Sequence, residues 1–261
     1  MKRLALIAAL CLAGCKKPPA PSAPDQAWLD GTPRATTATP KDGGALTIRL
    51  ALEPTGLTRL HDRFAEGTMT RITVGPLYET LGGRLATKVV RSDDHLTTTL
   101  TLRDGVTFHD GTPFTSADVK ATLDVILDAK NAASVLRTSL ETLANVETPD
   151  AKTVVLTWRR PYVFAEETVL HAVPMLPAHA LQGDWDTLPI HRAPVGTGPF
   201  RFEKWDPGVS ITYVKADARA HVDRVVFRVV KDEVAAQQAF ERGEFDVMTK
   251  IAPASWKAME K

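Results

Sequence analysis

Two Asp-Gly pairs, Asp104-Gly105 and Asp110-Gly111, restrict what the chain can form in the middle of its sequence. Both residue types tolerate the backbone conformation of a tight reversal, so each pair predicts a turn. Leucine and threonine recur with a period of two from Leu96 to Leu102, which is the pattern of a half-buried strand. The sequence therefore predicts a meander, with a strand over 96–102, a turn, a short strand over 106–109 and a second turn.

A helix start follows this meander. Thr115 precedes Asp118 by three residues, the arrangement of a capping box with Asp in place of Glu. Apolar residues then recur at helical spacing, so a helix should begin near Ser116. The polar residues of the motif, including His109 and Asp110, thereby receive turn or capping roles. We expect scaffolding here and no catalytic loop.

Charge and apolar content exclude two classes of protein. The chain of 261 residues carries 32 basic and 31 acidic side chains, a formal net charge of +1, so it has no basic field to recruit a nucleic acid. Apolar residues make up 44% of the chain, enough for a core, but no apolar run reaches the roughly 18 residues of a membrane span. We predict a globular body with no nucleic-acid partner.

The usual motifs of enzyme chemistry are missing from the sequence. It contains no G-x-S-x-G, S-x-x-K or phosphate-loop pattern, and no two of its seven histidines have the i, i+4 spacing of a helical zinc site. Gly196-Thr197-Gly198 is followed by Pro199 and a predicted strand, where a phosphate loop needs the start of a helix. We therefore predict that the protein is not an enzyme and has no catalytic residue, metal ligand or cofactor.

The N-terminus has the features of an export signal. Lys2 and Arg3 precede an apolar run, Leu4 to Leu12, and the run ends in the letters LAGC at Cys15. These letters resemble the lipobox of a bacterial lipoprotein, in which the cysteine is acylated. We predict a signal peptide over residues 1–15, lipidation at Cys15 and a lipid anchor in a membrane.

A proline-rich segment connects this signal to the body. Residues 16–44 contain six prolines among 29 residues and little periodicity, which predicts a disordered tether. Alternating residues begin at Ala45 and indicate the first strand of the folded region. Further along, the patterns predict a helical patch over 133–143, a strand over 153–158 and a hairpin with strands at 199–205 and 209–214. Strand, helix and strand then follow over 222–248, as a βαβ unit whose two strands should lie side by side. The body is predicted to be mixed α/β.

Four blocks of the body, in order, resemble family 5 of the extracellular solute-binding proteins, which serve ABC importers of peptides and nickel. The blocks are LYETL at 77–81, the meander with its helix start at 92–120, APVGTGPFRFEKWDPG at 193–208, and the strand-helix-strand segment at 222–248. The resemblance implies a class II periplasmic-binding-protein-like lobe over 45–261, with a small inserted meander and helix subdomain at about 77–190.

The chain also departs from the family pattern. It has few residues between YETL and the meander, and the segment after the hairpin is shortened to KADARAH. It stops at Lys261, where typical members continue through another lobe and return to the first. The resemblance therefore implies the N-terminal part of a two-lobed clamp, with the C-terminal lobe missing.

The resemblance implies a function without chemistry. We expect a monomeric, membrane-tethered lipoprotein of the cell envelope, on the periplasmic or extracellular face, that captures a peptide or similar small solute and delivers it to an ABC permease. The alternative is a surface lipoprotein with an interaction or sensory role that no longer transports. A secreted hydrolase is a third hypothesis, which is disfavoured because the sequence contains no assembled nucleophile or metal-binding pattern.

One residue is expected to contact the ligand. Glu53 directly follows the first strand, and by resemblance this junction faces the ligand cleft, where a carboxylate can meet the amino end of a peptide. The alternative is a solvated turn glutamate beside Pro54.

Overall fold

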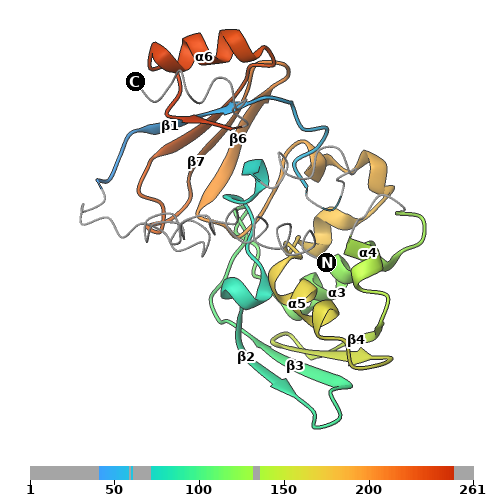
Figure 1. Cartoon of the computed structure of the whole chain (residues 1–261). Coiled ribbons are helices and arrows are strands. Elements are labelled where there is room, and N and C mark those ends of the chain that lie inside the picture. Colours follow the sequence, from blue (N-terminus) through green and yellow to red (C-terminus); the bar gives the residue numbers. More distant parts are fainter. Residues whose placement is uncertain (1–40, 59, 61–71, 132–135, 250–261) are drawn as a thin grey trace, which may run out of the picture. The chain divides into compact units, whose positions relative to one another are not determined.

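The computed structural model describes residues 41–58, 60, 72–131 and 136–249 (Figure 1), which belong to one compact unit, Lys41–Lys261. The predicted signal peptide, its lipidation site Cys15 and residues 16–40 of the predicted tether lie outside the described residues. Within the described ranges, no helix has the length and apolar character that a membrane crossing requires.

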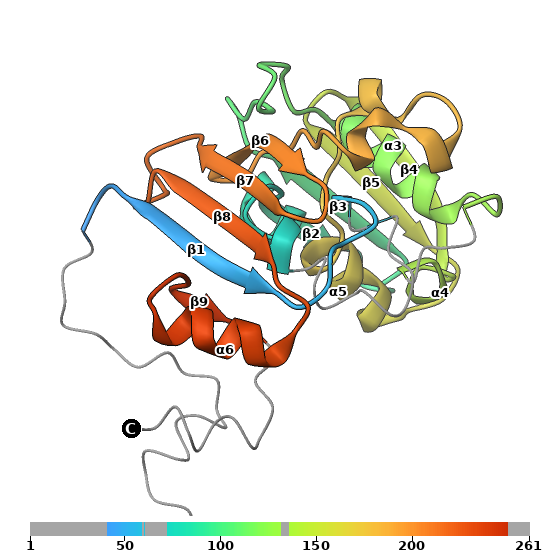
Figure 2. The ribbon, with the colours of Figure 1, turned by 90° about the horizontal axis from the view of Figure 1, so that it is seen from above.

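One sheet has five strands and contains the first strand of the folded region. β1 (Ala45–Leu50) pairs in parallel with β8 (Arg224–Val229) and with β9 (Val247–Met248). β7 (Ser210–Lys215) is antiparallel to β8, and β6 (Phe200–Asp206) is antiparallel to β7. The order is therefore β6-β7-β8-β1-β9, and Figure 2 shows β7, β8 and β1 as neighbouring arrows. The predicted first strand and the predicted hairpin are both confirmed.

The predicted side-by-side pairing of the βαβ unit is wrong. β8, the helix α6 (Glu233–Glu241) and β9 follow in sequence, but β1 lies between the two strands. All six residues of β1 pair with β8, whereas β9 offers only two pairs to the other side of β1. β1 thus lies next to the central strand β8, and the crossover from β8 passes β1 to reach the edge of the sheet.

The second sheet has four antiparallel strands in the order β2-β3-β5-β4. They are β2 (Ala86–Arg91), β3 (Thr97–Leu102), β5 (Thr153–Trp158) and β4 (Leu143–Asp150). The strands predicted over 96–102 and 153–158 are confirmed, while β2 and β4 were not predicted. Side chains alternate in burial along β3 and β5, as period-two patterning requires.

The predicted capped helix exists and packs on this second sheet. α3 (Ser116–Leu127) contacts β4 and β5, and its Val119, Leu123 and Ile126 are fully buried. These side chains share one apolar cluster with residues of β3 and β5. Further helices are α4 (Leu136–Ser139), α5 (Val163–His171), the π-helix η2 (Leu81–Leu85) and the 3₁₀ turns η3 (Ala178–Leu181), η4 (Trp185–Thr187) and η5 (Pro189–His191).

Two local predictions need correction. The helical patch expected over 133–143 is, within the described residues, only the four-residue α4, and β4 begins at Leu143. The short strand expected over 106–109 is reduced to one bridge, between Thr107 and Pro113. Both Asp-Gly turns are confirmed, since Gly105 and Gly111 have φ of +68° and +88°. The two turns follow so closely that the backbone between them has no room for a longer ladder.

Candidate functional site

The Gly-Thr-Gly loop lies directly on the backbone of the LYETL block. The amide of Gly198 donates to the carbonyl of Leu77 (2.8 Å), and the amide of Phe200 donates to the carbonyl of Pro76 (3.1 Å). A Cβ on Gly196 would lie 2.0 Å from the Leu77 oxygen, and one on Gly198 would lie 2.4 Å from the Pro76 oxygen. Both positions therefore require glycine, because the neighbouring backbone leaves no room for a Cβ. The loop is followed by the strand β6, whereas a phosphate loop would be followed by a helix.

His109 joins the meander to this loop. Its Nδ1 accepts from the amide of Gly196 (3.2 Å), and its Nε2 lies 2.9 Å from the carbonyl oxygen of Gly198. The two contacts together require a neutral imidazole with its proton on Nε2. The backbone of the same residue adds a bond, from its amide to the carbonyl of Gly196 (2.9 Å). His109 was expected to be a bystander in a scaffolding motif, and the structure shows that it binds the Gly-Thr-Gly loop through both ring nitrogens.

The stability of the protein is expected to fall in mild acid because of these two contacts of His109. Burial lowers the pKa of His109 below its ordinary 6.5; the nearby Arg201 and Arg219 also lower it, while the bond to Gly198 and the charge of Asp217 oppose the shift. The unfolded chain then takes up a proton before the folded one does. The contribution of the neutral form is therefore fully present above pH 6.5 and is lost as the pH falls through the lower folded-state pKa.

Denaturant unfolding from about pH 8 to about pH 5 measures this effect. His109→Gln should flatten the pH dependence of the free energy of unfolding, because glutamine does not titrate in this range. If the wild type and His109→Gln showed equal pH dependence, the neutral imidazole of His109 would not be the cause of the acid destabilisation.

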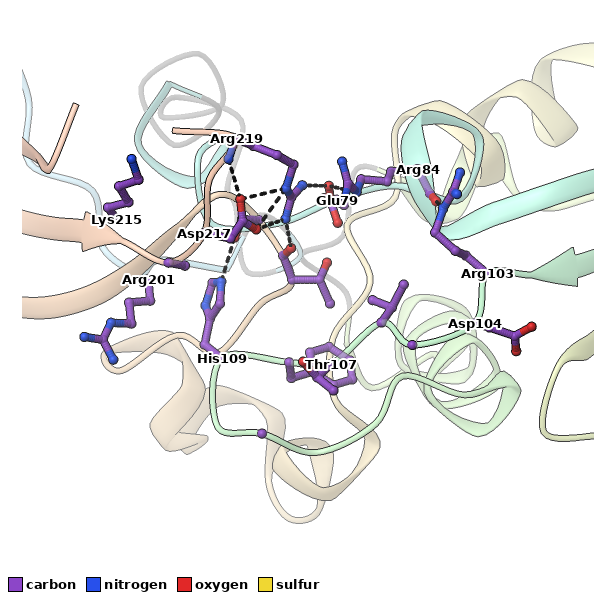
Figure 3. A pocket seen from close by; sticks show the side chains of 17 residues that line it. Glu79, Arg84, Arg103, Asp104, Thr107, His109, Arg201, Lys215, Asp217 and Arg219 are labelled. Atoms are coloured by element: carbon purple, nitrogen blue, oxygen red, sulfur yellow. Dashed lines mark hydrogen bonds and ion pairs between the residues drawn. The ribbon is translucent and has the colours of Figure 1, made fainter. Parts of the chain in front are cut away.

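A pocket of about 620 Å³ opens beside His109, which is part of its lining. Its walls come from four parts of the chain, and Figure 3 shows their side chains: the LYETL block with η2, the meander, the Gly-Thr-Gly loop with the start of β6, and the segment after β7. The lining is strongly charged, with arginines and a lysine facing a smaller number of carboxylates. Residues far apart in the sequence therefore share one polar cavity.

Arg219 is the centre of an ion-pair network on one wall of this pocket (Figure 3). Its Nε lies 2.9 Å from both carboxylate oxygens of Asp217, its NH1 pairs with Glu79, and its NH2 donates to the carbonyl of Thr197 (3.0 Å). Glu79 also pairs with Arg84 (3.4 Å). The hydrogen bond from Arg219 lowers the pKa of Asp217, so that this carboxylate stays charged. Sequence reasoning missed the network, whose only signal was a charged residue within the apolar LYETL block.

A buried arginine organises the ends of the parallel strands. Arg49 in β1 is fully buried, and its guanidinium donates to the carbonyls of Val230 (2.9 Å) and Thr249 (3.1 Å). These carbonyls follow β8 and β9, so one side chain joins the carboxyl ends of all three strands. In open α/β sheets this edge is where ligands bind. Sequence reasoning did not identify this role, although Arg49 is the one charged residue of β1.

Glu53 lies beyond this edge, after β1, and is tied to the hairpin between β6 and β7. Its Oε1 accepts from the indole of Trp205 (2.8 Å) and from the amide of Gly208 (2.8 Å). The guanidinium of Arg192 lies over the same indole ring, 4.2 Å from its centre. The carboxylate is half-buried and held in one orientation. Ligand contact by Glu53 stays a prediction, as does lipidation at Cys15, which lies outside the described residues.

No group of three or more His, Cys, Asp or Glu side chains suited to a metal ion occurs among the described residues. The charged pocket is a candidate site for binding, and two of its carboxylates, those of Glu79 and Asp217, are engaged by arginines. The geometry offers recognition of charged groups, with no nucleophile and general base placed together in it.

Comparison with known proteins gives consistent results. The model of the bacterial extracellular solute-binding proteins, family 5 Middle, matches residues 80–261. A relative from Brucella ovis, named as a peptide-binding protein of an ABC transporter, is 35% identical over 207 residues, which are 70% of this chain and 37% of the relative. The glutathione-binding protein GsiB of Salmonella typhimurium is 33% identical over 163 residues, 59% of this chain and 30% of that protein.

Solved structures extend the likeness to the fold. The oligopeptide-binding protein AppA of Bacillus subtilis, in complex with a nonapeptide, superposes with a TM-score of 0.78 at 25% identity, over 85% of this chain and 47% of that one. The substrate-binding protein CtaP of Listeria monocytogenes gives 0.75 at 29% identity, over 84% and 47%. The chain thus spans less than half the length of these proteins. The predicted fold class, a mixed α/β lobe of the periplasmic-binding-protein type, is confirmed.

Proposed function

Because the chain belongs to family 5 of the bacterial extracellular solute-binding proteins, we propose that it forms a lobe that captures peptides or similar small solutes for an ABC importer. The observation that carries this proposal is the superposition on AppA, a protein solved with a nonapeptide, over 85% of the present chain. Members of this family are solute-binding components of transporters, and we propose that this chain likewise binds without chemistry.

The mechanism requires capture and release. In a binding protein with two lobes, hinge closure encloses the solute, and affinity comes from excluding water and pairing the polar groups of the ligand. The edge formed by the carboxyl ends of β8, β1 and β9, which Arg49 organises, would supply part of one wall. The proposed partners are the solute, an ABC permease and a membrane, and the proposed location is the bacterial cell envelope.

The lipid anchor is tested at Cys15. We expect Cys15→Ser to move the protein from the membrane fraction to the soluble fraction of its host, because acylation of this cysteine would supply the hydrophobic anchor. Fractionation and labelling with a radioactive fatty acid measure the effect, and Cys11→Ser is the matched control. Label in Cys15→Ser, or its unchanged membrane partition, would contradict the anchor.

The ligand contact is tested with Glu53→Gln. Glutamine keeps an acceptor oxygen for Trp205 and Gly208 but removes the charge, so stability should change by less than about 1 kcal/mol. Affinity for peptides with a free amino terminus should fall by about tenfold, because the carboxylate no longer faces an ammonium group. Calorimetry measures the stability and the affinity for free and N-acetylated peptides, on a protein that carries both lobes.

The acetylated peptide is the internal control, because it lacks the ammonium group. Equal loss for free and acetylated peptides would show that the variant disturbs the hairpin contact, and no loss for either would remove Glu53 from the site. Failure of the wild-type protein to bind any peptide or small solute would contradict the proposed function itself.

A further inference from the structure

Arg192 lies at the edge of the five-stranded sheet that the carboxyl ends of β8, β1 and β9 form. β6 and β8 are both antiparallel to β7, so β6 runs in the same direction as β8 and ends at the same edge. Trp205 is the next-to-last residue of β6, and the guanidinium of Arg192 lies over its indole ring, 4.2 Å from the ring centre. Arg192 is therefore placed at the edge where open α/β sheets bind their ligands.

The backbone beside Arg192 is attached to this edge by its neighbour, His191. This histidine is only 5% exposed, and its Nε2 lies 2.5 Å from the carbonyl oxygen of Trp185 while its Nδ1 contacts the hydroxyl of Thr58. The carbonyl of His191 accepts from the amide of Leu57 (2.7 Å). Leu57 and Thr58 belong to the segment that follows β1, so the position of Arg192 is fixed through the backbone as well as through its stacking.

The guanidinium of Arg192 keeps its hydrogen-bond donors for a ligand. Within the ranges that the structure describes, it forms no hydrogen bond and no ion pair, although its planar group is held against the face of Trp205. Arg192 is exposed, so a solute can reach it. The N–H groups of a guanidinium form a fork that matches the two oxygens of a carboxylate. An arginine that is held by a ring while its fork is unoccupied is pre-organised for such a partner.

The opposite charge lies on another part of the same indole. Glu53 accepts from the N–H of Trp205 (2.8 Å) and from the amide of Gly208 (2.8 Å), both through Oε1. Glu53 and Arg192 both belong to the described residues, and no ion pair joins them. One ring therefore has a carboxylate at its N–H edge and a guanidinium over its face, and neither charge neutralises the other by direct contact.

We propose that Arg192 pairs with a carboxylate of the captured solute and so selects solutes that carry one, such as peptides with a free carboxyl end. The inference rests on the proposed function, because it takes this edge as part of the wall that the solute contacts. It extends that function by assigning the partner of the carboxylate. Charge-assisted pairs between arginine and carboxylate are bidentate and about twice as strong as neutral hydrogen bonds. Glu53 remains the expected partner of the ammonium group, so residues on one indole would recognise both ends of a short zwitterion.

Nuclear magnetic resonance of the indole N–H groups tests the pairing directly on this chain. The chain has five tryptophans, and the signal of Trp205 is the one that disappears in Trp205→Phe. The probes are the dipeptide alanylalanine and its carboxyl-terminal amide, titrated at matched ionic strength to remove general screening. The test variants are Arg192→Gln and Arg192→Lys. The matched control is Arg160→Gln, because Arg160 is also an exposed arginine over an aromatic ring, that of Tyr162 (5.4 Å), at the start of α5.

We expect alanylalanine to shift the Trp205 signal saturably in the wild type and in Arg160→Gln, and its amide to bind at least about tenfold more weakly. Arg192→Gln should weaken alanylalanine by about the same factor and leave the amide unchanged. Arg192→Lys should fall between the wild type and Arg192→Gln, because an ammonium group keeps the charge but lacks the fork. Thermal unfolding verifies that all variants are folded.

Three results would overturn the proposal. They are equal binding of alanylalanine and its amide by the wild type, equal binding of alanylalanine by the wild type and Arg192→Gln, and the absence of any saturable shift. The same titrations on a protein that carries both lobes keep this outcome separate from that of the proposed function. If that protein bound the dipeptide and its amide equally well, solute capture would stand and the role of Arg192 would be refuted.

Discussion

Gly196→Ala is expected to destabilise the fold by about 3 kcal/mol or more. The new Cβ would lie 2.0 Å from the carbonyl oxygen of Leu77 and 2.9 Å from the ring of Tyr78, and the first of these is backbone that cannot rotate away. The loop would have to move, and with it the two bonds that His109 makes to Gly196. Guanidinium unfolding, with the slope compared to that of the wild type, measures the loss.

Gly82→Ala is the matched control for this prediction. A Cβ at Gly82 would lie 2.3 Å from the ring of His171, a distance almost as short. The ring is the end of a half-exposed side chain, so it can rotate into solvent, and alanine is favoured over glycine in a helical segment. We expect a change of less than about 1 kcal/mol. Similar losses in the two variants would show that backbone contact is not the reason for the Gly-Thr-Gly loop.

Sequence patterns that span only a few residues predicted many of the secondary-structure elements correctly. Alternation located β3 and β5, the Asp-Gly pairs located two turns, and the Thr115 to Asp118 spacing located the start of α3. Each of these signals lies within a few residues, where backbone conformation and burial of one face determine the structure. Such patterns cannot rank strands within a sheet, and so the insertion of β1 between β8 and β9 was not predictable from them.

The candidate site depends on pairs that are remote in sequence. Arg219 and Glu79 are 140 residues apart, and the amide that His109 accepts from is 87 residues away. The sequence identified His109 as part of a scaffold but gave no partner for it. Sequence reasoning did not single out Arg49, although its burial and its bonds to two strand ends make it central to that edge. The partners of such residues can be identified only from the structure, because tertiary contacts bring them together.

Asp118→Ala is expected to destabilise the protein by about 3 kcal/mol, more than the loss of the predicted capping residue Thr115. Asp118 is buried, and one carboxylate oxygen accepts from both the amide (2.8 Å) and the hydroxyl (3.0 Å) of Thr115. The other oxygen accepts from the amide of Ala178 (2.8 Å), at the start of η3. Alanine would leave two backbone amides unpaired, one at the entry to α3 and one in a segment that packs on this helix.

The comparison with Thr115→Ala separates this network from an ordinary helix cap. The Thr115 hydroxyl lies against the Asp118 carboxylate, so its removal deletes one bond and leaves no amide unpaired, at a cost of about 1 kcal/mol. Asp118→Asn should fall between the two alanine variants, because its single carbonyl oxygen can serve the Thr115 side or Ala178 but not both. Chemical unfolding of the three variants gives the order, and a larger loss for Thr115→Ala than for Asp118→Ala would mean that the threonine caps α3 directly.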